Sequence, residues 1–352
     1  MGTVPLTCVR VYTLQWPRPI RCRVYPVAVD AAGRSPDAFA ERVRAYEEAW
    51  LSPLAVRSLE TRGREEHEDA CGVRTPFQRD RDRLVHSKPF RRLKGKTQVF
   101  IDPEGDHYRT RMTHTLETTA ISRVVARALH LNEDLVEAIG LGHDTGHTPF
   151  GHAGEEALDQ ALDAAFGRSF HHNEQSWRIA RRLNLTYEVC DGILTHTGAQ
   201  EPQTLEGKIV RVVDRVAYIN HDIDDAMRYG ILSDSDLPRA EIELLGTTGS
   251  ARIDRLVHDL VETSEREGTI RQSPEIGEAM LSLRAFMFER VYLGPQVGPE
   301  HRRAHDVVQA IFGRLVDDPE LLPAGEGDLG DRITDYVSGM TDRFAIVYAG
   351  AL

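Results

Sequence analysis

Histidines are concentrated in one part of the sequence. Of 15 histidines, eight fall within 66 residues: His107, His114, His130, His143, His147, His152, His171 and His172. The decapeptide HDTGHTPFGH holds three of them beside Asp144, and Pro149 with two glycines restricts its backbone. One buried histidine is common in a core, but a cluster in a rigid turn indicates a site that binds a metal or transfers protons.

Four residues could supply ligands for one divalent metal. His143 and Asp144 are adjacent, so they cannot face one direction on a regular helix, but both reach one ion if a second helix presents His114 across the gap. Asp214 is the fourth candidate because it lies in the apolar stretch VRVVDRVAYI, where an unpaired carboxylate would be costly to bury. The alternative for Asp214 is an ion pair with Arg215 or another base.

Two imidazoles and two carboxylates make a mixed set of nitrogen and oxygen ligands. Such a set favours Mn, Fe, Co or Ni over Mg, which prefers oxygen ligands. We expect manganese first, with Fe, Co, Ni or Mg as alternatives. A bound ion of this kind lowers the pKa of its water ligand and polarises a phosphoryl group, so the chemistry it indicates is hydrolysis.

A second spacing places polar groups on one helix face. Asp214, Tyr218 and Asp222 are four residues apart, so a carboxylate, an aromatic ring and a second carboxylate would follow one another along a helix. The alternative for Tyr218 is a core position in which the phenol finds a polar partner, as buried tyrosines usually do.

The elements that must carry these residues are helices. Apolar residues recur every three or four positions in residues 36–51, 114–129, 132–143 and 252–266. Asn132 is the expected cap of the third of these helices. Because long periodic segments of this kind dominate the chain, we predict an all-α fold.

Helix breakers follow the third helix directly. Gly146, Pro149 and Gly151 interrupt the pattern before another helix starts in GEEALDQALDAAF, so a tight turn would hold the polar side chains rigidly. Alternation with a period of two is nearly absent, apart from one short β-hairpin expected at residues 98–108.

Composition places the chain among globular enzymes. Hydrophobic residues make up 41% and charged residues 28% of the 352 positions, and no apolar run approaches the roughly 20 residues that cross a bilayer. Four cysteines occur without a C-x-x-C pair, which favours a reducing compartment. We therefore expect a cytoplasmic protein without a membrane partner.

The charge is acidic overall but locally basic. A net charge of -12 disfavours nucleic acid as the main partner, because such binding depends on summed positive charge. Between Arg74 and Lys96, however, nine Lys or Arg stand against only two Asp. This stretch would suit a phosphate-rich small ligand, and the alternative is a solvated basic face.

Longer motifs resemble one family of the HD superfamily. His114, the adjacent His143 and Asp144, and the distant Asp214 match the H…HD…D pattern of that superfamily. Five longer segments resemble the dGTPase-like deoxynucleoside triphosphate triphosphohydrolases. They are RTRMTHTLE, EAIGLGHDTGHTPFGHAGEEAL, HHNEQSWRI, TLEGKIVRVVDRVAYINHDIDDA and DYVSGMTDRFAI. The likeness runs over residues 61–344. It implies an HD-domain helical bundle with additional helices.

The resemblance assigns roles to individual residues. The metal ligands would be His114, His143, Asp144 and Asp214. The catalytic residues would be His147, His152, Glu155 and His172. Substrate contacts would come from Gln98, Arg111, Arg215, Tyr218 and Asp222, with Asp222 accepting from the 3'-hydroxyl of the sugar and Tyr218 against the deoxyribose. His196 is an additional candidate that the sequence does not decide.

The family also implies a substrate and an organisation. We expect a dNTP to be cleaved to a deoxynucleoside and inorganic triphosphate by a homo-oligomer. Residues 1–35 would be an unassigned extension, and 36–352 a single HD-type hydrolase domain with a C-terminal helical part and an HD core at about 107–230. Base preference, activation by a nucleotide and the number of subunits stay open.

Two other functions compete with this prediction. Another HD phosphohydrolase, acting on an alarmone or a cyclic dinucleotide, could use the same metal. A non-enzymatic nucleotide sensor or nucleic-acid scaffold would draw support from the basic stretch. The words HTPFGHAGE and HHNEQS favour the triphosphohydrolase, and the complete ligand set weighs against an inactive site.

Overall fold

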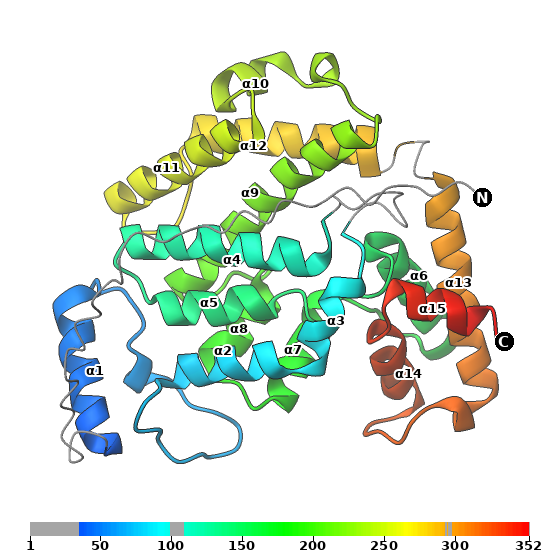
Figure 1. Cartoon of the computed structure of the whole chain (residues 1–352), viewed down its shortest axis with the longest axis horizontal. Coiled ribbons are helices and arrows are strands. Elements are labelled where there is room, and N and C mark those ends of the chain that lie inside the picture. The colour runs from blue at the N-terminus through cyan, green and yellow to red at the C-terminus, as the bar shows by residue number, and fades with distance from the viewer. Residues whose placement is uncertain (1–34, 99–108, 293, 295–297, 352) are drawn as a thin grey trace, which may run out of the picture.

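The computed structural model describes residues 35–98, 109–292, 294 and 298–351. Within these ranges the protein has fifteen α-helices and no β-strand, so the predicted all-α class is confirmed (Figure 1). The expected hairpin and the N-terminal extension fall outside the described residues, apart from Gln98 and Ser35. A single antiparallel bridge joins Thr97 to Thr110. No helix in the described part of the chain is long and apolar enough to cross a membrane.

The helices are joined by connections of varied length, and a long one lies between α1 and α2. In chain order they are α1 (Pro36–Trp50), α2 (Pro76–His86), α3 (Lys88–Arg92), α4 (Arg111–Ala128), α5 (Glu133–Gly142), α6 (Gly151–Phe166), α7 (His172–Arg182), α8 (Tyr187–Thr195), α9 (Leu205–Arg228), α10 (Arg239–Leu245), α11 (Gly249–Glu267), α12 (Pro274–Met287), α13 (Gly298–Asp317), α14 (Leu329–Ser338) and α15 (Asp342–Ala349). A 3-10 turn, η3 (Leu93–Gly95), follows α3, and a π-helical turn, η5 (Phe288–Tyr292), extends α12.

Side-chain caps set where helices α5 and α9 begin. The carbonyl oxygen of the Asn132 side chain accepts from the Leu135 amide at 3.2 Å, which confirms the cap expected for α5. Helix α9 starts in the same way, since the hydroxyl of Thr204 accepts from the Gly207 amide at 3.0 Å. Such caps stabilise a helix by about 1 kcal/mol each because they satisfy amides that have no partner within the helix.

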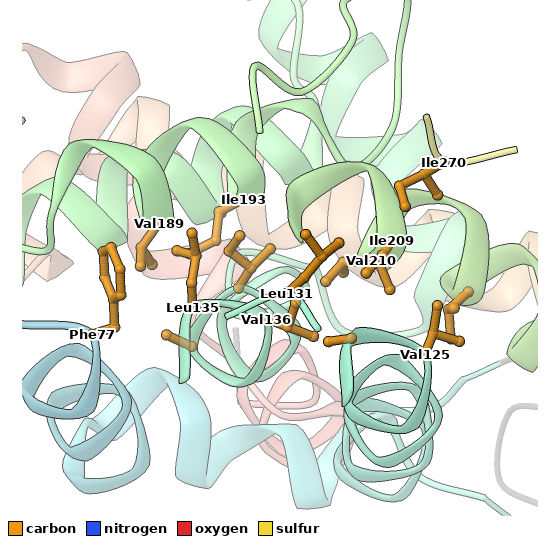
Figure 2. Close-up of a cluster of buried hydrophobic side chains, with 14 of the residues drawn as sticks. Phe77, Val125, Leu131, Leu135, Val136, Val189, Ile193, Ile209, Val210 and Ile270 are labelled. Carbon is orange, nitrogen blue, oxygen red and sulfur yellow. The ribbon is translucent and has the colours of Figure 1, made fainter. Parts of the chain in front are cut away.

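The first apolar core joins the helices that carry the predicted ligands. Leu135 and Val136 of α5 pack against Ile193 of α8 and Ile209 and Val210 of α9 (Figure 2). Each of these five side chains is fully buried, which stabilises the fold by roughly 1.5–3 kcal/mol per residue. This packing fixes the N-terminal part of α5 against the N-terminal part of α9, ahead of the predicted ligands in the chain.

Two further cores lie on either side of the first. Helix α6 packs with α13, α14 and α15 around residues such as Leu158, Val308 and Val337. The second half of α9 packs with α11 and α12 through Ile223 and Leu283 among others. Helix α9 therefore belongs to two cores, and its central turns, where the predicted site residues lie, are held from both directions (Figure 1).

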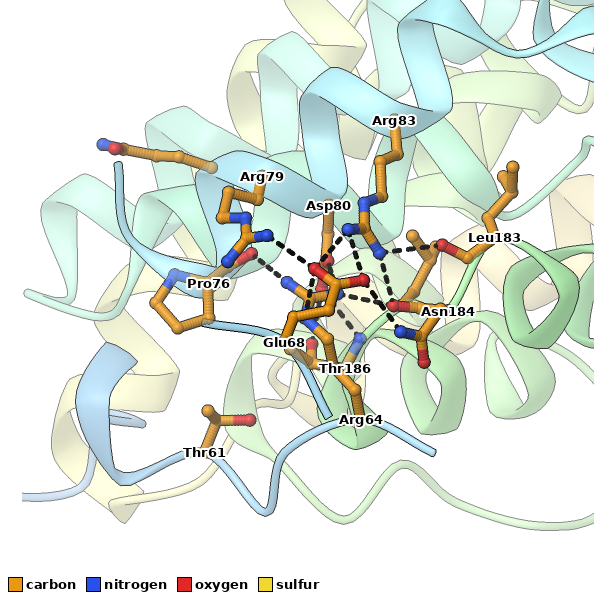
Figure 3. Close-up of polar contacts among 12 residues, drawn as sticks. Thr61, Arg64, Glu68, Pro76, Arg79, Asp80, Arg83, Leu183, Asn184 and Thr186 are labelled. Carbon is orange, nitrogen blue, oxygen red and sulfur yellow. Dashed lines mark hydrogen bonds and ion pairs between the residues drawn. The ribbon is translucent and has the colours of Figure 1, made fainter. Parts of the chain in front are cut away.

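Much of the basic stretch that starts at Arg74 forms internal ion pairs. Arg79 and Arg83 of α2 both contact the carboxylate of Glu68, and the guanidinium of Arg64 pairs with the buried Asp80 (Figure 3). The hydrogen bond from Arg83 is the main cause that lowers the pKa of Glu68 to about 2. These arginines hold the segment before α2 onto the helices, so they are not a free surface for phosphate.

Candidate active site

The predicted turn connects α5 to α6 and is buried. Helix α5 ends at Gly142, and residues 143–150 are all buried. Gly146 has no room for a side chain, because an added Cβ would lie 2.2 Å from the backbone nitrogen of Ser176 on α7. The amide of Gly146 donates to the Ser176 hydroxyl at 2.9 Å, so the turn is attached to a neighbouring helix.

The four predicted metal ligands meet at the start of this turn. Nε2 of His114 on α4 lies 3.0 Å from Oδ1 of Asp214 on α9. Nε2 of His143 lies 3.6 Å from the same Asp214 oxygen and 3.7 Å from Oδ1 of Asp144. Asp214 therefore faces the two imidazoles instead of forming an ion pair with Arg215.

The orientation of His143 fits a metal ligand. Its Nδ1–H donates to the carbonyl of Gly140 at 2.7 Å, which leaves Nε2 free to coordinate. That Nε2 atom is buried and has no hydrogen-bond partner. Burial opposes a charge on His143, but the carboxylates of Asp144 and Asp214 outweigh it and raise the pKa of the imidazole to about 9. The same negative field favours a bound cation, so these residues fit a divalent metal.

A second cluster surrounds the carboxylate of Glu155. This carboxylate lies 2.9 Å from Nδ1 of His172, 3.5 Å from Nε2 of His147 and 3.6 Å from Nδ1 of His152. The backbone amide of His172 also donates to it at 2.9 Å. One carboxylate therefore orients three imidazoles that come from the turn, from α6 and from α7.

The environments of two of these histidines favour opposite protonation states. Burial opposes a charge on His172, but the Glu155 carboxylate outweighs it and raises the pKa of His172. Burial lowers the pKa of His147 well below its ordinary value, and the positive charge of Arg111 adds to that effect. Such a separation is typical of sites that hold an acid and a base side by side.

His196, which the sequence left undecided, belongs to this cluster. Its Nδ1–H donates to the carbonyl of Ile193 at 2.7 Å, so Nε2 is an acceptor in the neutral ring. Nε2 of His172 lies 3.2 Å away, which is hydrogen-bond distance. Burial lowers the pKa of His196 to about 4, so His172 is the partner that donates.

The far end of the site is the row on α9. The phenol of Tyr292 donates to Oδ2 of Asp222, and Oδ1 of Asp222 is buried without a partner. Burial raises the pKa of Asp222 to about 7, although the bond from Tyr292 opposes that shift. The phenol oxygen of Tyr218 accepts from Nε of Arg284 at 2.6 Å.

One cavity contains most of these groups. Its lining includes Gln98, Arg111, His114, Asp144, His147, His152, His172, His196, Thr197, Asp214, Tyr218, Asp222, Arg284, Phe288 and Tyr292. His143 and Glu155 lie beside it and contact its lining residues. Arg111 pairs with Oδ2 of Asp144 at 2.8 Å. Arg215 is absent from the lining, and its Nε donates to the carbonyl of Arg211 at 3.3 Å.

Three lining residues of the α12 region were not predicted from the sequence. Arg284, Phe288 and Tyr292 are four residues apart, so they share one face of α12 and the turn that extends it. That spacing is visible in the sequence. It was not informative alone, because aromatic residues at helical spacing are usually part of a core.

Comparisons with known proteins agree with this arrangement. The HD domain model matches residues 111–219, which include all four predicted ligands, and the phosphohydrolase-associated domain model matches residues 270–349. Relatives named deoxyguanosinetriphosphate triphosphohydrolase-like protein occur in several bacteria. The one from Caldanaerobacter subterraneus subsp. tengcongensis is 49% identical over 84% of this chain and 90% of the relative. The relative from Clostridium perfringens strain 13 is 44% identical over 86% of this chain and 94% of the relative. The relative from Desulfatibacillum aliphaticivorans is 41% identical over 87% of this chain and 95% of the relative.

The helical fold, the HD-domain match and the His/Asp cluster define an HD phosphohydrolase. The chain belongs to the deoxyguanosinetriphosphate triphosphohydrolase-like family of the HD superfamily. Among solved structures, that of a hypothetical protein from Aquifex aeolicus is similar, with a TM-score of 0.44 and 22% identity over 76% of this chain and 67% of the other.

Proposed function

We propose that the protein hydrolyses deoxynucleoside triphosphates to a deoxynucleoside and inorganic triphosphate. The observation that carries the proposal is that one cavity is lined by the three histidines around Glu155, by His114, Asp144 and Asp214 of the ligand set, and by Asp222 with Tyr218. The names of the relatives point to the same substrate class.

In this proposal His114, His143, Asp144 and Asp214 hold one divalent ion, with manganese preferred over Fe, Co, Ni or Mg for the mixed ligand set. When bound, such an ion activates water and polarises the phosphoryl group. The direct bond from Arg111 to Asp144 limits how far that carboxylate can turn, so Arg111 orients a ligand as well as adding positive charge near the phosphates.

The histidines around Glu155 act on the triphosphate. His152 with Glu155 assists at the scissile phosphate, because the carboxylate lies close enough to orient the imidazole. His172 lies between Glu155 and His196 and offers a proton to a triphosphate oxygen. His147 binds the same group in its neutral form.

The α9 row binds the sugar. Oδ1 of Asp222, which has no protein partner, accepts the 3'-hydroxyl. The ring of Tyr218 lies against the deoxyribose and leaves no room for a 2'-hydroxyl. Gln98, whose side-chain oxygen is buried without a partner, contacts the sugar or the base. Arg215 would have to leave the carbonyl of Arg211 before it could reach a phosphate.

The decisive experiment incubates the purified protein with each of the four dNTPs and Mn, then separates the products by chromatography. Triphosphate and a deoxynucleoside are expected, and Asp214→Ala serves as the inactive control. Pyrophosphate with a monophosphate, or orthophosphate with a diphosphate, would contradict the proposal. Cleavage of an alarmone or a cyclic dinucleotide, with none of the dNTPs, would favour another HD phosphohydrolase.

A further inference from the structure

Two side chains outside the HD-domain match contact the backbone of the turn between α5 and α6, one at its middle and one at its end. Nζ of Lys96, which follows η3, donates to the carbonyl of His147. Oδ1 of Asp342, the first residue of α15, accepts from the amide of Phe150 at 2.9 Å. Neither side chain lines the cavity, so both act on the site only through the turn.

Lys96 links the turn to the C-terminal helices. Its side chain is 1% exposed, and Nζ also donates to the carbonyl of Ser338, the last residue of α14, at 2.8 Å. Burial lowers the pKa of Lys96 to about 7, and its nitrogen can donate hydrogen bonds in either form. Burying this group is costly unless its hydrogen bonds are formed, so it restrains both carbonyls together.

Asp342 stabilises an unfavourable backbone conformation at Phe150. Phe150 has φ +62°, a left-handed conformation that a residue with a side chain rarely adopts, and Gly151 follows with φ +57°. These two residues set the direction in which α6 starts, and Glu155 lies in its first turns. The second oxygen of Asp342 accepts from both the amide and the hydroxyl of Thr97. One carboxylate therefore joins the Thr97 segment, the turn and α15.

The residue before Lys96 packs closely against the residue before Asp342. Gly95 lies so close to Thr341 that an added Cβ would come within 2.9 Å of its methyl group. The second core packs α6 against α13, α14 and α15, which holds Ser338 and Asp342 beside the turn.

We propose that Lys96 and Asp342 are positioning residues that make the rate of hydrolysis depend on helices α14 and α15. The inference rests on the proposed function for its kinetic test, but the restraint itself can be measured without substrate. Shifting the turn would move His147 and the start of α6, and a misplacement of about 1 Å can cost about 100-fold in rate.

The test compares Lys96→Met and Asp342→Ala with the wild-type protein. Hydrogen exchange of peptides that cover residues 143–155 should become faster in both variants. With dGTP and Mn, kcat should fall about 10- to 100-fold while KM stays within about twofold and bound metal is unchanged. Asp342→Asn, which keeps one acceptor for the Phe150 amide, should lose less kcat than Asp342→Ala.

Asp328→Asn is the matched control. Asp328 pairs with Arg168 at 3.1 Å and caps α14, and asparagine keeps the cap while the ion pair is lost. This variant should keep wild-type kcat and exchange. The proposal would be overturned if Lys96→Met and Asp342→Ala kept the kcat and the hydrogen-exchange rate of the wild type. It would also be overturned if their loss of activity matched the fraction of protein that is unfolded. If the wild type cleaves no dNTP, the proposed function fails, and exchange alone decides whether the restraint exists.

Discussion

The phenol of Tyr292 donates a hydrogen bond to one oxygen of Asp222, and the other oxygen of that carboxylate is buried without a partner. The π-helical turn after α12 thus orients a carboxylate on α9. A buried acceptor with no donor is costly, and a ligand hydroxyl would remove that cost.

Asp222→Ala should lower kcat/KM for a dNTP and for the matching NTP by a similar factor, because both sugars carry a 3'-hydroxyl. At pH 8, above the pKa of about 7 that burial gives Asp222, the hydrogen bond is to a charged group and contributes about 1.5–3 kcal/mol, which corresponds to roughly 10- to 100-fold. Steady-state kinetics with both substrates measures it. Tyr292→Phe keeps the ring and removes only the bond that orients Asp222, so it should lower kcat/KM for both substrates by less than Asp222→Ala does. A loss confined to the dNTP would show that Asp222 does not bind this hydroxyl.

Tyr218→Ala should raise activity on NTPs relative to dNTPs, if the ring of Tyr218 occupies the space of a 2'-hydroxyl. A site that merely lacks a partner for one hydroxyl discriminates by about 100-fold, so a stronger wild-type preference would indicate a steric clash. The bond from Arg284 makes a purely structural role the alternative. Tyr218→Phe keeps the ring and loses that bond, so it should keep the sugar preference. An unchanged NTP to dNTP ratio in Tyr218→Ala, with a lower melting temperature, would reject the steric role.

Asp214→Ala, and the double variant His143→Ala with Asp144→Ala, should abolish turnover and lower the bound metal measured by elemental analysis. The Asp214 carboxylate lies close to the imidazoles of His114 and His143. Its removal therefore takes away one proposed ligand and the negative charge beside two others. Removal of metal with a chelator should likewise stop the wild-type enzyme, and added Mn should restore it. Full metal content in Asp214→Ala would exclude Asp214 as a ligand.

His152→Ala should keep the metal and slow turnover by roughly 10²- to 10⁴-fold, the usual range for a general acid or base. The side chain of His152 is 66% exposed and touches Glu155 at the rim, away from the ligand cluster. Glu155→Gln should also slow turnover without loss of metal, because three imidazoles lose their orienting charge. Loss of metal from the His152 variant would contradict the assignment of His152 as a catalytic residue that does not hold the metal.

Glu68→Gln should lower the free energy of unfolding at pH 7 by up to about 3 kcal/mol, because Arg79 and Arg83 lose a charged acceptor. The folded pKa of Glu68 is about 2, below its ordinary value of 4.5, so its contribution is present above pH 4.5 and is lost as the pH falls towards 2. The difference in melting temperature between wild type and variant should be constant from pH 7 to 5 and shrink below 4.5. Glu48→Gln, an exposed change on α1, should show no such trend.

Several local features of the site could be read from the sequence. The cap at Asn132, the breaks at Gly146 and Pro149 and the spacing of Asp214, Tyr218 and Asp222 depend on backbone preferences and helix periodicity within a few residues. Side chains of the predicted ligand set do meet in the structure, because a carboxylate in an apolar helix needs a partner wherever the helix packs.

Where the sequence left a side chain's partner open, only the tertiary structure decided it. Asp214 faces His114, a hundred residues away, and not its neighbour Arg215. Lys96, one of a run of basic residues, is buried against two carbonyls, and Tyr292 reaches Asp222 from another helix. These contacts depend on how apolar faces of distant helices pack together. Local preferences along the chain carry no information about that packing.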